Sequence, residues 1–288
     1  MKNEPLDAGL YLVATPIGSA RDITLRALDV IRAAQILVAE DTRTARRLMA
    51  CHGIRLGDRK LISYNDHNGS RQREKILEWL RRGQPIALLS DAGTPLIADP
   101  GFQLAAAARS EGHKVVTIPG ASAVIAALTL SGLPTDRFLF AGFAPKNGSK
   151  RRQMLEELAN LQATLVVFES ARRLPETLNV VAGIFGPLRQ VAVCREMTKR
   201  FEEVWRGNAE SVAARAAATP VKGEIVILID RAGRQLPERE RLYQDLGAAL
   251  TSMTVRDAVA AVATAHAMPR SEIYRLAIEM QRRDHPEQ

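Results

Sequence analysis

Short runs rich in β-branched and apolar residues alternate with longer helical patterns along most of this chain. The first series of runs covers residues 10–15, 36–39, 61–64, 85–90 and 114–118. Between the first two runs, apolar residues recur at helical spacing, at Ile23, Ala27, Val30, Ile31 and Ala34. This alternation predicts a mostly parallel sheet covered by helices, and therefore an α/β protein.

A second series predicts strands over residues 137–141, 164–168, 190–194 and 224–229, with helices near 148–161, 171–185 and 209–218. With 288 residues, the chain exceeds the usual size of one domain. We expect two α/β domains, residues 1–125 and 126–232. A linker and a small helical region, residues 233–288, would follow them.

The helical C-terminal region has a recognisable start. After a charged stretch typical of a linker, RAGRQLPERERL, Thr254 and Asp257 have the spacing of a capping box that opens a helix. Met268-Pro269 ends this helix, and SEIYRLAIEM begins another. Two helices across a short turn suit either a nucleic-acid-reading helix-turn-helix or a pair that packs on the main body or a partner subunit. The loose turn pattern favours the second interpretation.

Charge and cysteine content bear on partners and location. Forty Lys and Arg against 32 Asp and Glu give a net charge of +8, which favours a polyanionic partner such as RNA, although it also serves solubility. Two cysteines cannot form a disulfide framework or a metal cluster. No apolar run is long enough to span a bilayer, and the first residues lack the apolar run of a signal peptide. We predict a cytoplasmic protein without a metal site.

The segments that follow the predicted strands fall into two kinds. ATPIG (14–18), SDAGTP (90–95) and PGASA (119–123) are made of small residues, proline and glycine. AEDTR (39–43), SYNDHN (63–68), FESARR (168–173) and CREMTK (194–199) carry charge. Ligands of open parallel sheets bind beyond the carboxyl ends of the strands. The segments of small residues therefore allow a ligand to approach the backbone closely, whereas the other segments place charged side chains at the same edge.

The small-residue turns do not match the common phosphate-binding motifs. The chain contains neither G-x-G-x-x-G nor G-x-x-x-x-G-K-[ST], and GFAPKNGSK (142–150) has the wrong spacing. This argues against dinucleotides and nucleoside triphosphates. A ligand held mainly by main-chain groups beside an apolar purine slot fits better, although each turn alone is also ordinary turn chemistry.

Several motifs in order resemble one known family: VATPIG, AEDTR, SYNDHN, LLSDAGTPLIADPG, TIPGASA, FAPKNGSKRRQ, FESARR and CREMTKRFEEVWRG. They are similar to the tetrapyrrole methylases, and within them to the bacterial branch that methylates small-subunit ribosomal RNA. The similarity covers about residues 8–230. It implies two α/β domains with an S-adenosylmethionine cleft between them, and a homodimer. The implied reaction is methylation of a ribose 2′-hydroxyl of a cytidine in the decoding region of 16S rRNA, within the 30S subunit, with neither DNA nor a membrane as partner.

The resemblance also implies site residues. Carried over by motif, the cofactor-binding residues are Pro16, Asp91, Ala92, Gly93, Thr94, Ser122, Ala123 and Phe168. After TPIG the family usually continues Asn-Leu-x-Asp, whereas this chain has Ser19-Ala20-Arg21-Asp22. A serine cannot reproduce the paired donor and acceptor of an amide, so Ser19 receives no binding role.

Charged residues at strand ends are the catalytic candidates, because a base would help to remove the proton of a ribose hydroxyl. The charged residues at strand ends are Glu40, Asp41, His67, Glu169, Glu196 and Lys199. We take Asp41, Glu196 and Lys199 as the catalytic candidates. Glu196 and Lys199 equally suit a structural ion pair, and Arg43 could simply hold Asp41 in place.

Basic residues supply the RNA-binding candidates: Arg43, His67, Lys146, Lys150, Arg151 and Arg152. Most of them lie in FAPKNGSKRR, where Phe143 could stack a base if it is exposed. The competing interpretation makes Phe143 a core residue and the cations a solvated helix start. Cations at a helix N-terminus oppose the macrodipole, so their accumulation there favours an anionic partner.

Two other functions remain open. A methyltransferase of the same fold could act on a small tetrapyrrole, but it would need no RNA-binding surface. A non-catalytic RNA-binding module would leave the small-residue turns without a role. Binding of S-adenosylmethionine separates the second of these from the enzymes.

Overall fold

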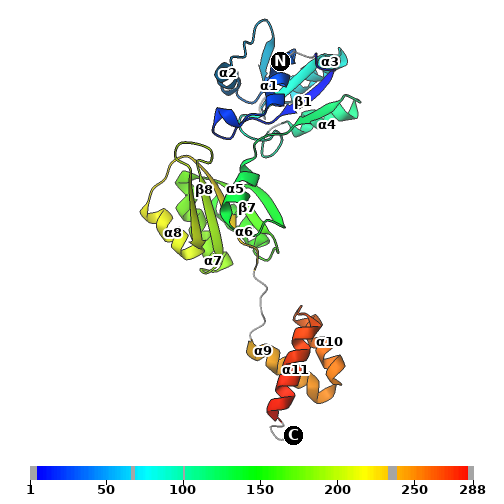
Figure 1. Ribbon diagram of the computed structural model, residues 1–288, viewed down its shortest axis with the longest axis vertical. Coiled ribbons are helices and arrows are strands. Elements are labelled where there is room, and N and C mark those ends of the chain that lie inside the picture. The colour runs from blue at the N-terminus through cyan, green and yellow to red at the C-terminus, as the bar shows by residue number, and fades with distance from the viewer. Residues whose placement is uncertain (1–4, 66–68, 100, 233–238, 285–288) are drawn as a thin grey trace. The chain divides into compact units, whose positions relative to one another are not determined.

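The computed structural model describes residues 5–65, 69–99, 101–232 and 239–284. The chain divides into two units, Met1–Arg231 and Ala232–Gln288. The first unit contains two five-stranded sheets with helices packed on them (Figure 1). No helix of the described residues is long and apolar enough to cross a membrane.

The first sheet has the strand order β3-β2-β4-β1-β5, and all its strand pairs are parallel. Its strands are β1 (Gly9–Val13), β2 (Ile36–Ala39), β3 (Lys60–Ser63), β4 (Pro85–Leu89) and β5 (Val115–Ile118). Its helices are η1 (Ala20–Asp22), α1 (Leu25–Ala33), α2 (Thr42–Cys51), α3 (Gly69–Arg81) and α4 (Phe102–Ser110). The predicted parallel α/β arrangement is confirmed here.

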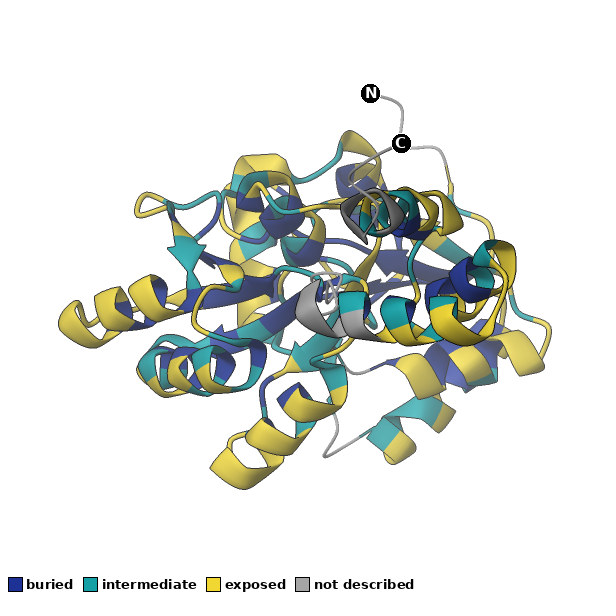
Figure 2. Ribbon diagram, turned by 90° about the horizontal axis from the view of Figure 1, so that it is seen from below, coloured by how far each residue is buried: buried dark blue, intermediate teal, exposed yellow. Residues whose placement is uncertain are grey.

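Helices cover both faces of this sheet, because successive strand residues point to opposite sides. Tyr11 and Val13 pack in one cluster with residues of α1 and α2. Leu10 and Leu12 pack in the other with residues of α3 and α4. In Figure 2, strands of the chain are coloured as buried, while many helices are exposed on their outer faces.

The second sheet has the order β6-β7-β10-β8-β9. Its strands are β6 (Phe138–Phe143), β7 (Thr164–Ser170), β8 (Gln190–Arg195), β9 (Glu203–Asn208) and β10 (Glu224–Ile229). Its helices are α5 (Ala123–Ser131), α6 (Gly148–Leu158), η2 (Ala171–Arg173), α7 (Leu174–Phe185) and α8 (Ala209–Ala218). Only β6 and β7 pair in parallel, and the other three pairs are antiparallel.

The antiparallel pairing follows from β9, a strand that the sequence analysis missed. A short loop without a helix joins β8 to β9, so the chain reverses direction there. The sequence of β9, EVWRGN, contains two charged residues and a glycine, and its only fully buried side chain is Trp205. Its position at the sheet edge explains why so polar a segment forms a strand.

Helix α5 follows β5 of the first sheet but packs on the second. Val124, Ala127 and Leu128 share a core cluster with residues of β7, β8 and β10. Helices α6, α7 and α8 contribute to the separate cluster on the opposite face. The predicted domain border between residues 125 and 126 falls within α5.

The second unit contains α9 (Arg239–Ser252), α10 (Val255–Ala265) and α11 (Arg270–Asp284), which share one apolar cluster. The predicted cap is present: the Thr254 hydroxyl group accepts a hydrogen bond from the Asp257 N–H at 3.3 Å. Helix α9 begins within the stretch that the sequence analysis took as a linker.

Candidate functional site

The turn after β4 connects the carboxyl ends of three neighbouring strands. Gly93 has a φ of +80° and forms a β-bridge with Thr15, at the end of β1. Thr94 Oγ1 donates a hydrogen bond to the Ala121 carbonyl, after β5, at 3.1 Å. A positive φ costs glycine little, which explains the small residue at this position.

The loop that follows this turn contains strained backbone. Leu96 and Ala98 have φ values of 70° and 62°, which are unfavourable for residues with a Cβ. The Ser90 hydroxyl group contacts both the Asp99 carboxylate and the Ala92 carbonyl oxygen, which ties the loop back to the end of β4. Strain of this kind persists where surrounding structure enforces it, often at ligand sites.

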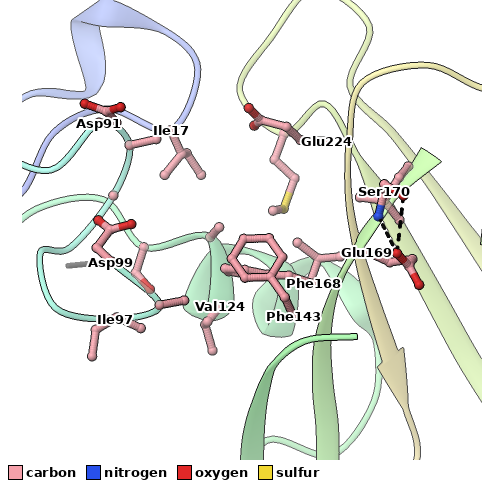
Figure 3. Close-up of a pocket in the computed structure, with 18 of the residues that line it drawn as sticks. Ile17, Asp91, Ile97, Asp99, Val124, Phe143, Phe168, Glu169, Ser170 and Glu224 are labelled. Carbon is pink, nitrogen blue, oxygen red and sulfur yellow. Dashed lines mark hydrogen bonds between the residues drawn. The ribbon is translucent and has the colours of Figure 1, made fainter. Parts of the chain in front are cut away.

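A cleft of about 550 Å³ lies beside this loop, between segments from both sheets. Its volume is in the range of small-molecule binding sites. Its apolar lining comes from Ile17, Ala92, Ile97, Ala98, Ala123, Val124, Phe143, Phe168, Met197, Ile225 and Val226. Figure 3 shows Asp91, Asp99, Ile17 and Ile97 on one side of the cleft, and Phe143, Phe168, Glu169 and Ser170 on the other.

Two carboxylates give one side of the cleft its negative charge. Burial raises the pKa of Asp91 from its usual value, although a hydrogen bond from the Asp41 N–H, at 2.9 Å, opposes the shift. Burial also raises the pKa of Asp99. Carboxylates in such surroundings favour a cationic ligand, because it would offset their loss of hydration.

A second hollow, of about 470 Å³, shares Asp91 with the cleft. Asp41 lines this hollow and caps α2. Its carboxylate accepts a hydrogen bond from the Arg43 N–H and a bidentate pair from the Arg43 side chain, from Nε to Oδ1 and from Nη2 to Oδ2. These hydrogen bonds lower the pKa of Asp41 to about 2. A carboxylate with so low a pKa is a weak proton acceptor at neutral pH. The Arg43 side chain is 89% exposed and holds Asp41.

The other two catalytic candidates form an ion-pair network in the β8–β9 loop. Lys199 Nζ lies 2.8 Å from Glu196 Oε1 and 3.0 Å from Glu224 Oε2. Hydrogen bonding to Lys199 lowers the pKa of Glu196. Burial acts to lower the pKa of Lys199. The hydrogen bonds and charges of Glu196 and Glu224 outweigh this effect, so the pKa of Lys199 is raised. Only Glu224 of these three lines the cleft, so the network positions the loop.

The predicted cofactor residues mostly come together. Asp91, Ala92, Gly93, Thr94, Ser122, Ala123 and Phe168 all line the cleft. Pro16 is absent from the described lining, and its neighbour Ile17 contributes instead. The sequence analysis gave no role to Asp99, Met197 or Arg173, which also line it. Asp99 could have been identified from the sequence, because it lies within the motif SDAGTPLIADPG.

The predicted RNA-binding residues separate into different environments. Lys146 is exposed and lines the cleft, while Lys150 and Arg152 are exposed on α6. Arg151 requires a correction: its side chain is fully buried and pairs with Glu176 at 2.5 Å, so it does not present its charge to a partner. His67 lies outside the described residues.

Comparison with known proteins identifies the family. A model of the tetrapyrrole (corrin/porphyrin) methylases matches residues 9–213. A ribosomal RNA small subunit methyltransferase I from Mesorhizobium japonicum is 43% identical over 277 residues, which cover 96% of this chain and 93% of that protein. The chain belongs to the ribosomal RNA small subunit methyltransferase I family. A second member, from Bacillus subtilis, is 36% identical and covers 92% of each chain.

Solved structures with low sequence identity share the fold of this family. Uroporphyrin-III-C-methyltransferase from Thermus thermophilus has a TM-score of 0.56 at 19% identity, over 78% of this chain and 95% of that one. The same enzyme complexed with S-adenyl homocysteine has a TM-score of 0.54 at 18% identity, over 78% and 98%. Diphthine synthase has a TM-score of 0.60 at 14% identity, over 77% and 89%.

As a tetrapyrrole methylase, this chain is an S-adenosylmethionine-dependent methyltransferase, and the predicted cofactor is confirmed. The residues of the cleft fit this group. Asp91 and Asp99 suit its cationic sulfonium, and the apolar lining suits a purine. The small side chains of Ala92, Gly93 and Ala123 leave the backbone accessible.

Proposed function

We propose that this chain transfers the methyl group of S-adenosylmethionine to the ribose 2′-hydroxyl group of a cytidine in the decoding region of 16S rRNA, within the 30S subunit. The observation that carries the proposal is the 43% identity to a ribosomal RNA small subunit methyltransferase I over 96% of this chain. We further propose that it acts as a cytoplasmic homodimer.

The charges around the cleft support an RNA acceptor. Lys146 lies on its edge, and Phe143, which is 62% exposed, presents an aromatic face there. Exposed aromatic rings and cations together are the groups that bind unstacked RNA bases and phosphates. A non-catalytic RNA-binding module would have no use for a cleft that fits the methyl donor.

The chain contributes mainly by positioning the reactants. S-adenosylmethionine supplies an electrophilic methyl group on a sulfonium. Asp91 and Asp99 would hold the cationic sulfonium at one side of the cleft, and the apolar lining would exclude water from it. Asp41 and Glu196 are held in ion pairs with lowered pKa values, which argues for positioning roles. The proton of the hydroxyl group has to leave as the new C–O bond forms.

Ribose methylation of isolated 30S particles tests the proposal. The protein is incubated with radiolabelled S-adenosylmethionine and 30S particles from cells that lack the corresponding enzyme, and the label is mapped by nucleotide. We expect label on a 2′-oxygen of a decoding-region cytidine. Uroporphyrinogen III and protein-free 16S rRNA serve as alternative acceptors. Label in the tetrapyrrole, with none in either RNA, would contradict the proposal and support the tetrapyrrole alternative.

Cofactor affinity should fall in mildly acidic solution. Because burial raises the pKa of Asp91 and Asp99, they take up protons at a higher pH than ordinary aspartates and then lose their attraction for a sulfonium. We expect the dissociation constant for S-adenosylmethionine to increase as the pH falls, and the increase to begin at a higher pH than ordinary aspartates would give, measured by calorimetry. Asp41→Asn should retain a dependence shifted to lower pH, because Asp41, with a pKa of about 2, does not itself titrate here but its charge helps to raise the pKa of Asp91. A flat profile for the unmodified protein would contradict the assignment.

A further inference from the structure

Glu169, near the end of β7, is a charged residue whose side chain is fully buried. Its carboxylate accepts from donor groups of three residues, Ser170, Thr177 and Arg173. The Ser170 N–H and the Thr177 hydroxyl group each donate to it at 2.6 Å, and Arg173 Nη2 lies 2.5 Å away. A buried charge is tolerated only when it is paired and hydrogen-bonded, so this carboxylate restricts Arg173 to one position.

Arg173 is held in the wall of the cleft and has donors to spare. It precedes α7, its side chain is 23% exposed, and Nη2 also lies 3.4 Å from the Ala144 carbonyl oxygen. Its Nε and Nη1 atoms form no hydrogen bond with any described residue. A guanidinium group presents five N–H donors in a fixed plane, so one carboxylate does not exhaust it.

The charges that line the cleft are segregated. Lys146 and Arg173 are the lining cations, and they lie on segments of the second sheet, beside Phe143 and Phe168. The lining carboxylates Asp91 and Asp99 belong to the loop of the first sheet. The other lining carboxylates are paired within the chain: Glu169 with Arg173, and Glu224 with Lys199, which also pairs with Glu196. An anionic group is therefore attracted to one side of the cleft only.

The cationic side has the composition of a nucleotide subsite. Phe143 contacts Phe168 edge to face, with ring centroids 5.2 Å apart, yet remains 62% exposed. Lys146 forms no ion pair with any described residue, and it lies in the loop whose Ala144 carbonyl oxygen Arg173 contacts. Base stacking on an exposed ring and phosphate binding by adjacent cations are the usual components of single-stranded RNA recognition.

We propose that Arg173, held in place by Glu169, binds a backbone phosphate of the acceptor RNA next to the methylated nucleotide. This inference rests on the proposed function and adds a specific RNA contact to it. Arg173 would orient the acceptor strand so that its phosphate avoids the carboxylates of Asp91 and Asp99. Glu169 is the positioning residue, because it acts through Arg173.

Arg173→Gln tests the proposal, with Arg172→Gln as its matched control. Arg172 is the exposed neighbour and is absent from the described lining of the cleft, so both variants lose the same charge. For Arg173→Gln we expect KM for 30S particles to rise about 10-fold, and the slope of log binding constant against log salt concentration to fall by about one. The affinity for S-adenosylmethionine should change less than about twofold. Arg172→Gln should leave KM within about twofold of the unmodified protein.

Arg173→Lys distinguishes the loss of an RNA contact from a purely structural effect. It retains the charge but not the bidentate geometry, so we expect an intermediate KM and the original salt slope. Thermal unfolding of each variant reports whether it is folded. An unchanged KM and salt slope in folded Arg173→Gln would overturn the proposal. So would a matching loss of cofactor affinity, which would assign Arg173 to the cofactor.

Direct binding of 30S particles, measured over several salt concentrations, keeps this test separate from the proposed function. If the unmodified protein binds 30S particles but does not methylate them, the proposed reaction fails while the salt slopes still decide the role of Arg173. If it methylates them and the two glutamine variants behave alike, the reaction stands and the role of Arg173 fails.

Discussion

Asp91→Ala should weaken S-adenosylmethionine binding by about 100-fold, which corresponds to about 2.7 kcal/mol at 25 °C. Asp91 lines both the cofactor cleft and the neighbouring hollow, and its carboxylate accepts the Asp41 N–H at 2.9 Å. The substitution removes an anion from the side of the cleft that suits a sulfonium. It also leaves the Asp41 N–H without its acceptor. Calorimetric titration with S-adenosylmethionine measures the loss, and methylation of 30S particles should fall with it.

Asp29→Ala is the control for the loss of one negative charge. Asp29 lies on α1, its side chain is 54% exposed, and among the described residues it pairs only with Arg32, its neighbour on the same helix. Surface pairs of this kind contribute little, so we expect cofactor affinity within about twofold of the unmodified protein. Equal cofactor affinities for Asp91→Ala and Asp29→Ala would contradict the assignment of the turn after β4 to cofactor binding.

The parts of the fold that follow from local sequence could be predicted. Apolar runs bounded by turns correspond to nine of the ten strands among the described residues, and Thr254 caps the helix that follows it, as predicted. The turn at Asp91–Thr94 could be identified because its composition alone indicates a close backbone approach. The tenth strand, β9, was missed, because an edge strand with polar residues lacks the apolar pattern.

The missed features of the site depend on contacts between residues far apart in the chain. Arg151 is buried because Glu176, on another helix, pairs with it, and no local pattern indicates that pair. Met197 enters the cleft because the β8–β9 loop packs against the segment after β1, where the Ser19 N–H donates to Thr198 Oγ1 at 3.1 Å. Sequence spacing indicates which residues share an element, but not which loops meet.

Because these two loops are in contact, we also expect Gly18→Ala to lower both the stability of the protein and its affinity for the cofactor. A Cβ atom at Gly18 would lie 2.4 Å from Thr198 Oγ1 and 2.7 Å from the Met197 carbonyl oxygen, both too close. The opposing loop cannot adjust freely, because Glu196 and Thr198 already have positive φ values of 49° and 62°. Gly18→Ala should therefore separate the two loops that bring Ile17 and Met197 to the cleft.

For Gly18→Ala we expect a loss of about 1–3 kcal/mol in the free energy of unfolding, measured by chemical denaturation, because overpacking in a closed contact costs this much. Cofactor affinity should fall by about 10-fold, because one wall of the cleft moves. Gly183→Ala is the matched control. Gly183 lies in α7, and a Cβ atom there would have no described atom within 4 Å, so alanine should stabilise the helix by up to about 1 kcal/mol. Equal stability and affinity for Gly18→Ala and the unmodified protein would show that the β8–β9 loop yields freely, and that the ion pairs of Glu196, Lys199 and Glu224 do not fix the wall of the cleft.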